Sequence, residues 1–213
     1  MYYSPDKIRQ LLLQPLPGYR SHIKMAPESR KHELMQQKPV PGNAKKSAVM
    51  MLFYHKDDIL KMIMIRRSLY VGVHSGQIAF PGGRFEETDE SIKHTAFREI
   101  EEEIGIQPDK IELLGRLSDI YVPPSNFLIS IFAGYLPEKP VYNIDEREVS
   151  EIIELDLTEL LNPTIVTNKS FYVPSAGQSF QAPCYSTSQC DIWGASAMVI
   201  SELVDLFLTT RTQ

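Results

Sequence analysis

A glutamate-rich stretch carries the residues of this chain that are best suited to chemistry. Glu99, Glu102 and Glu103 are three and four positions apart, which places them on one face of an α-helix. Three carboxylates on one patch suit a hard cation, because Mg²⁺ and Mn²⁺ prefer oxygen ligands. Glu99 and Glu103 also form a like-charge pair, and neither has a basic residue three or four positions away. The pattern predicts a metal site; the alternative is a solvated acidic face.

The elements around these glutamates must hold them in place. Phe97, Ile100 and Ile104 recur at helical spacing on the opposite side of the same helix, so we expect them to pack on a core. Gly82 and Gly83 mark a turn ahead of the helix. The sequence thus predicts a glycine loop followed by a rigid acidic helix.

This stretch resembles the signature of the Nudix hydrolases, G-x5-E-x7-R-E-U-x-E-E-x-G-U, in which U is a bulky aliphatic residue. Residues 98–106 match its second half at every fixed position. The first half is one residue longer, because six residues rather than five separate Gly83 from Glu90. The resemblance implies a Mg²⁺ or Mn²⁺ cofactor with Glu99, Glu102 and Glu103 as ligands. It also implies that Arg98 braces a glutamate of the signature.

The segment before the signature resembles the coenzyme A pyrophosphatases within this family. Its matching residues are Arg67, Ser68, His74 and residues 76–83, Gly-Gln-Ile-Ala-Phe-Pro-Gly-Gly. The longer signature of that subgroup is reproduced by Asp89-Glu90, and residues 192–197 resemble the turn that begins its final helix. Two positions depart from the pattern: Gly72 stands where an arginine is common, and Glu86 where an aspartate is common.

The resemblance implies a diphosphatase that hydrolyses coenzyme A, or acyl-CoA, to 4′-phosphopantetheine and adenosine 3′,5′-bisphosphate. One alternative is a Nudix pyrophosphatase for ADP-ribose, NADH or a dinucleotide polyphosphate, and another is a noncatalytic Nudix ligand sensor. The implied catalytic residues are Arg98, Glu99 and Glu148. The implied substrate-binding residues are Arg67, Ser68, Gln77, Gly82 and Gly83.

Two of these residues have ordinary alternatives. Glu148 is the candidate for a further metal ligand or general base, but it is equally a solvated acid in an acidic loop. His74 is more readily interpreted as a loop histidine or a satisfied buried one than as a catalytic group.

Composition and charge agree with a globular enzyme. The chain has 213 residues, of which 43% are hydrophobic and 23% charged. A net charge of −5 argues against a nucleic-acid partner. Cys184 and Cys190 are the only cysteines, which predicts neither a disulfide framework nor a zinc cluster. Without an apolar run long enough for a membrane span, we expect a cytoplasmic protein with a small nucleotide substrate; a homodimer is compatible with the sequence.

The periodicity predicts an α/β fold, and the resemblance implies the Nudix fold: an α/β/α sandwich with a mixed sheet and the acidic helix packed on it. We expect residues 1–46 to form a short helix and an extended arm, and residues 47–213 to form the hydrolase domain. The arm is interpreted as a solvated linker or, alternatively, as a phosphate-binding segment. The other expected elements are a helix over 6–13, strands over 47–54, 59–67, 110–122, 127–136 and 152–157, a helical turn over 158–161, a hairpin of 171–173 with 180–185, and a helix over 195–208.

Overall fold

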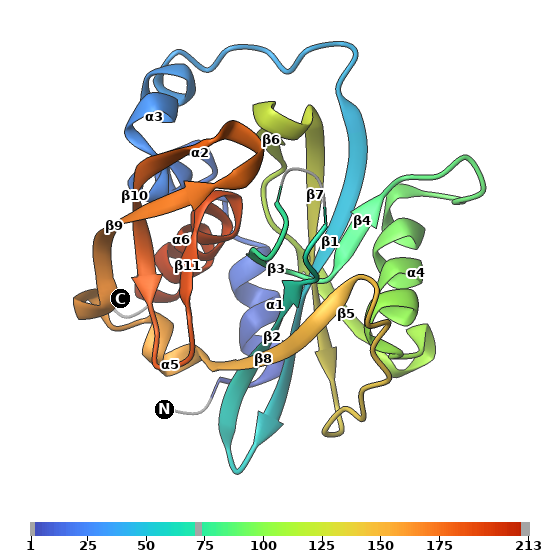
Figure 1. Cartoon of the computed structure of the whole chain (residues 1–213). Coiled ribbons are helices and arrows are strands. Elements are labelled where there is room, and N and C mark those ends of the chain that lie inside the picture. Colours follow the sequence, from blue (N-terminus) through green and yellow to red (C-terminus); the bar gives the residue numbers. More distant parts are fainter. Residues whose placement is uncertain (1–2, 71–73, 210–213) are drawn as a thin grey trace.

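A central strand organises the protein, whose computed structural model describes residues 3–70 and 74–209. This strand, β1 (Lys45–Lys56), pairs in parallel with β7 (Phe127–Leu136). On its other side it pairs antiparallel with β2 (Ile59–Arg67) along one part and with β4 (Gly82–Arg84) along another. The predicted hairpin of the first two strands is therefore confirmed, and the sheet is mixed (Figure 1).

Four further strands extend this sheet. They are β3 (Ile78–Ala79) and β8 (Val149–Asp156) on the β2 side, and β5 (Glu112–Arg116) and β6 (Ile120–Val122) on the β7 side. The single strand predicted over 110–122 is wrong, because the chain leaves the β7 ladder between β5 and β6. Ser118 instead donates its backbone N–H and its hydroxyl to the carboxylate of Glu202, at 3.2 and 2.6 Å.

Helices cover both faces of the sheet, so the predicted α/β/α sandwich is confirmed (Figure 1). Alternate residues of β1 face opposite cores, as the pleat of a strand requires. Leu52 faces the core beneath α4 (Ile92–Ile104), whereas Phe53 faces the core beneath α1 (Pro5–Leu12) and α6 (Gly194–Thr209). No helix within the described residues is both long and apolar enough to cross a membrane.

A small antiparallel sheet lies beside α6. It consists of β9 (Val166–Val173), β10 (Gln178–Ser186) and β11 (Asp191–Trp193). The predicted late hairpin is confirmed but is longer than expected. The remaining short elements are α5 (Leu157–Leu160), η2 (Pro108–Lys110), η3 (Pro123–Ser125), η4 (Pro163–Ile165) and η5 (Pro174–Ala176).

The expected extended arm within residues 1–46 is instead helical over residues 19–25 and 28–35, and its longest stretch without a helix is residues 36–44. It contains α2 (Tyr19–His22), η1 (Ile23–Met25) and α3 (Glu28–Met35). Polar contacts rather than an apolar stripe hold α2 against α6. His22 Nε2 lies 3.1 Å from Glu202 Oε2, and Ser201 donates its hydroxyl to the Ser21 carbonyl at 2.7 Å. Such contacts leave no apolar period in the sequence. The division of the chain after residue 46 stays a prediction.

Candidate active site

Helix α4 presents the glutamates because both of its ends are fixed. Ser91 caps the N-terminus by accepting the His94 N–H at 3.1 Å, and Gly105 ends the helix in the left-handed conformation with φ 73°. Ile100 and Ile104 are completely buried under the sheet, as their spacing predicts. The face carrying Glu99 and Glu103 is thereby turned toward the glycine loop.

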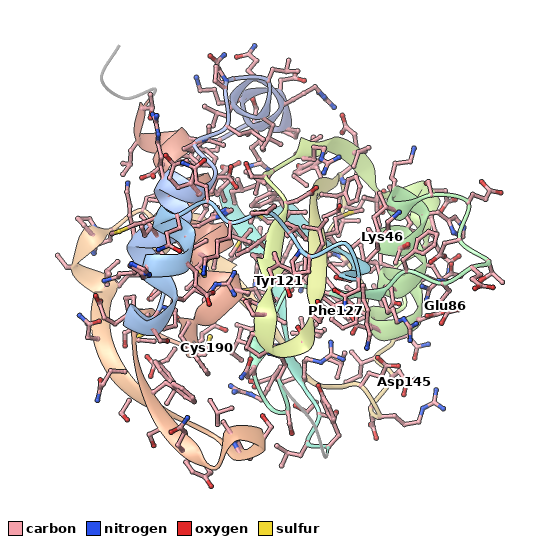
Figure 2. The ribbon with its side chains drawn as sticks, turned by 90° about the horizontal axis from the view of Figure 1, so that it is seen from above. Lys46, Glu86, Tyr121, Phe127, Asp145 and Cys190 are labelled. Atoms are coloured by element: carbon pink, nitrogen blue, oxygen red, sulfur yellow. The ribbon has the colours of Figure 1, made fainter. Side chains whose placement is uncertain are left out.

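Three carboxylates meet beside this loop. One oxygen from each of Glu99, Glu103 and Glu148 lies within 4.8 Å of the others. Glu148 is brought there by the loop that precedes β8, where Asp145 donates its backbone N–H to the Glu103 carbonyl oxygen at 3.1 Å. Figure 2 labels Asp145 on the side of the molecule where α4 lies.

The glycines are needed for close approach to these carboxylates. The Gly82 N–H donates to Glu103 Oε2 at 2.8 Å, so this N–H serves the glutamate rather than a diphosphate. A Cβ on Gly83 would lie 2.3 Å from Glu99 Oε2. A Cβ on Gly82, whose φ is +145°, would lie 2.3 Å from the Ala48 carbonyl oxygen. Any side chain at either position would displace the site.

Arg67 joins two of the carboxylates. Its guanidinium lies 3.3 Å from Glu103 and 3.9 Å from Glu148. Ser68 holds the acidic loop, because its N–H donates to the Glu148 carbonyl at 2.8 Å and its hydroxyl to the Glu146 carbonyl at 2.9 Å. These two residues, expected to bind substrate, thus first position Glu103 and Glu148.

Arg98 ties the helix to the loop before it. Its guanidinium contacts Asp89, Glu99 and Glu102 at 2.8–3.1 Å. The Asp89 side chain is fully buried and also accepts the Thr95 hydroxyl at 2.9 Å. The hydrogen bonds from Arg98 hold the pKa of Asp89 far below its usual value, and Asp89 holds the pKa of Arg98 well above its own. The pair therefore stays ionised and braces Glu99.

Burial disfavours the negative charge on two of the clustered acids. It raises the pKa of Glu103 to about 8, although Arg67 and the Gly82 N–H act in the opposite direction. It also raises the pKa of Glu99 against the influence of Arg98. A cation would offset this cost, and three carboxylate oxygens are donors that Mg²⁺ and Mn²⁺ prefer. The donor set fits a divalent metal.

A cleft of about 540 Å³ opens from the glycine loop. One end contains Arg67, Gln77, Gly82 and Gly83. Apolar side chains dominate the rest of its wall: they come from β6, β7, the small sheet and α6, and include Ile120, Phe127, Phe180, Trp193 and Met198. The arrangement can hold a charged group near the carboxylates and a long, mostly apolar group beyond them.

Comparisons with known proteins give this geometry a family. A model described as the NUDIX domain matches residues 44–174. This chain belongs to the Nudix hydrolase family. A protein of Photorhabdus laumondii described as "Uncharacterized Nudix hydrolase NudL" is 34% identical over 142 residues, which cover 67% of this chain and 74% of the relative. A protein of Escherichia coli O7:K1 with the same description is 32% identical over 146 residues, covering 67% and 72%.

Solved Nudix structures share the fold. RenU, a Nudix hydrolase from M. smegmatis, superposes with a TM-score of 0.55 at 11% identity, covering 78% of this chain and 87% of that one. The MutT protein from Methanosarcina mazei Go1 gives a TM-score of 0.50 at 18% identity, covering 76% and 92%. The sandwich described above is therefore the Nudix fold. Nudix hydrolases act on nucleoside diphosphate derivatives and generally use divalent metal ions such as Mg²⁺.

The Nudix signature is only partly gathered into the carboxylate cluster. Glu102 lies outside it: its side chain is 57% exposed and is paired with Arg98 at 2.8 Å. It stays a predicted ligand, since an exposed carboxylate on that face can turn toward a cation. Sequence reasoning assigned no role to Asp89, whereas Glu90, the acid that fits the written signature, is exposed.

Two further expectations concern the loop before β3. Gln77 lines the cleft, and its amide oxygen lies 2.9 Å from Nδ1 of His74. His74 has a positive φ of 69° and shapes this turn, in agreement with its interpretation as a loop histidine. Gly72 lies outside the described residues.

Proposed function

We propose that this Nudix hydrolase cleaves the diphosphate of coenzyme A or acyl-CoA, giving 4′-phosphopantetheine and adenosine 3′,5′-bisphosphate. One observation carries the proposal: the subgroup-like segment supplies Arg67, Gln77, Gly82 and Gly83 to a single cleft beside the carboxylate cluster. Residues that resemble the coenzyme A pyrophosphatases in sequence are thus neighbours in space, where substrate choice would be made.

The shape and chemistry of the cleft also support this substrate. Pantetheine is a long arm of low charge, and an acyl group adds apolar length. The wall formed by Phe180, Trp193 and Met198 offers apolar surface of that kind. ADP-ribose and NADH, the alternatives, would place a sugar or a nicotinamide against the same wall.

The residues of this chain divide the work of hydrolysis. Glu99, Glu103 and Glu148 would hold the cation, with Glu102 as the further predicted ligand. When bound, Mg²⁺ or Mn²⁺ neutralises phosphate oxygens and acidifies a water molecule. Glu148, the most exposed member of the cluster at 52%, is alternatively the proposed general base that accepts the proton of the attacking water. Arg98 and Arg67 keep the acids oriented.

A substrate panel tests the proposal. Purified protein with Mg²⁺ is incubated with coenzyme A, acetyl-CoA, a medium-chain acyl-CoA, ADP-ribose, NADH and diadenosine tetraphosphate, and products are separated by chromatography. We expect adenosine 3′,5′-bisphosphate to be released, with coenzyme A or an acyl-CoA giving the highest kcat/KM. A higher kcat/KM for ADP-ribose, NADH or the dinucleotide would contradict it, and turnover of none would favour a noncatalytic sensor.

A further inference from the structure

Arg30, in α3, lines the substrate cleft from outside the region that the family model matches. In Figure 1, α3 lies at the same end of the molecule as β6 and the β7 tip. The cleft wall there is apolar and includes Ile120, Val122 and Phe127. A cation against apolar surface is costly unless an anion or hydrogen-bond acceptors compensate it. The Arg30 guanidinium therefore needs an anion or a hydrogen-bond acceptor to compensate its charge.

The protein itself satisfies only part of the hydrogen-bonding capacity of this guanidinium. Arg30 Nη2 donates to the backbone carbonyl of Tyr121. Its Nε is buried, and no described group accepts a hydrogen bond from it. Burial lowers the pKa of Arg30, which the nearby Glu33 opposes without offsetting. No carboxylate of the described residues forms a salt bridge with Arg30, whereas the adjacent Lys31 pairs with Glu28 at 2.8 Å.

Strand register places this guanidinium relative to the glycine loop. A row of paired residues crosses the sheet from β6 to β4: Ile120, Ile129, Ser47 and Arg84. Three strand spacings of about 4.8 Å, roughly 14 Å in all, therefore separate two strands. One is β6, which contains the Tyr121 carbonyl that Arg30 contacts, and the other is β4, which contains Gly82 and Gly83. Figure 2 shows Tyr121 and Phe127 near one another at this end of the sheet. Arg30 is thus across the cleft from the carboxylates rather than among them.

We propose that Arg30 binds a phosphate monoester of the substrate, separate from the diphosphate that is cleaved. The N–H donors of an arginine form charge-assisted hydrogen bonds with phosphate oxygens, and Arg30 faces the cleft with a guanidinium that the protein only partly satisfies. Some nucleotide derivatives, such as coenzyme A and NADPH, carry such a group on the ribose, a few bonds from the diphosphate. If the proposed function is correct, this group is the 3′-phosphate of coenzyme A, which dephospho-CoA lacks.

Matched substrate pairs test this role. Wild type, Arg30→Gln and Lys31→Ala are compared on coenzyme A against dephospho-CoA and on NADPH against NADH. Arg30→Gln removes the charge and, because the glutamine side chain ends two bonds short of Nη2, also loses the contact with the Tyr121 carbonyl. We expect its KM for coenzyme A to rise about 10- to 100-fold, as for the loss of a charge-assisted hydrogen bond, with the KM for dephospho-CoA within about twofold of wild type.

Lys31→Ala is the control, because Lys31 lies on the same helix but pairs with Glu28. It should leave the KM ratio of each substrate pair unchanged. Melting temperatures of all variants show whether α3 remains packed. An unchanged coenzyme A to dephospho-CoA ratio in folded Arg30→Gln would overturn the proposal.

A binding measurement keeps this inference separate from the proposed function. Calorimetric titration compares adenosine 3′,5′-bisphosphate with AMP on wild type and Arg30→Gln. Tighter binding of the bisphosphate by wild type alone supports the role of Arg30 even if another diphosphate proves to be the substrate. Equal binding of both ligands by wild type, with no effect of the substitution, would show that Arg30 recognises no second phosphate.

Discussion

The carboxylate of Glu99 lies directly against the backbone of Gly83. A methyl group on that glycine would be 2.3 Å from Glu99 Oε2, far inside van der Waals contact. Gly83→Ala should therefore push Glu99 away from Glu103 and Glu148. We expect kcat to fall about 10- to 100-fold, as for a misplacement near 1 Å, with a higher Mg²⁺ concentration needed for half-maximal rate. Gly42→Ala is the matched control, since no atom lies within 4 Å of its Cβ position.

The carboxylates of α4 should differ in their effect on activity. Glu103→Gln and Glu102→Gln are both expected to lower kcat by at least about 100-fold, because each removes a charged oxygen donor predicted to hold the cation. Glu101→Gln, on an exposed side chain of the same helix, should stay near wild type. Steady-state rates across a Mg²⁺ titration give the comparison. Substantial activity in Glu102→Gln would remove that residue from the ligand set and leave the three clustered acids.

The contact of Asp89 with Arg98 predicts that substitutions at Asp89 and at its neighbour Glu90 differ in their effect on stability. Asp89→Asn loses the charge that holds Arg98 inside the fold, so the free energy of unfolding should fall by about 2 to 4 kcal/mol and activity should fall with it. Glu90→Gln should change stability by less than about 0.5 kcal/mol, as expected for an exposed side chain. Urea unfolding of both variants measures the difference. Equal effects would contradict the assignment of Asp89 as the anchor of Arg98.

The polar contacts between α2 and α6 predict loss of stability in acid. Burial alone would raise the pKa of Glu202, but hydrogen bonds from His22, Ser118 and the Gly18 N–H outweigh it and lower that pKa below its ordinary 4.5. The folded protein therefore binds fewer protons than the unfolded chain in this range. The stabilisation from Glu202 is complete above about pH 4.5 and is lost as pH falls through the folded pKa.

A variant isolates this contribution. Glu202→Gln should be less stable than wild type at neutral pH by about 1 to 3 kcal/mol, since it weakens a buried hydrogen-bond network. Its unfolding free energy should also fall less steeply between pH 5 and 3 than that of wild type, measured by urea titration at each pH. Glu138→Gln, at an exposed position, should keep the wild-type slope. A wild-type slope in Glu202→Gln would mean that other groups set the acid limit.

The acidic helix and its packing could be predicted because the evidence is local. Ile100 and Ile104 share one face by spacing alone, and the structure buries both. Glu148 is different: it reaches the cluster through a loop far along the chain, so no spacing could place it, and only the family resemblance suggested it. Asp89 rather than Glu90 contacts Arg98 because of a turn in which Asp89 accepts the Glu86 N–H at 2.9 Å. Which of two adjacent acids faces inward cannot be read from composition.

The segment before β1 was hardest to predict for a physical reason. Helix α2 of this segment is held by hydrogen bonds between polar side chains, such as His22 with Glu202, unlike α1, whose Ile8 and Leu11 are buried in the core. Periodicity detects apolar stripes and is blind to such pairs. A basic, proline-containing stretch was therefore expected to be extended, although it forms α2 and α3.

The cleft is lined by parts of the chain that lie inside and outside the matched family region. The glycine loop, which contacts the carboxylates, lies within the matched region, whereas Pro27 and Arg30 come from the segment before it and Phe180 and Trp193 from the segment after it. On the proposed role of Arg30, substitutions in the segment before the matched region would alter which nucleotide fits without touching any group that activates water. Substrate choice and hydrolysis would then be set by different parts of the chain, so that one could change while the other stays constant.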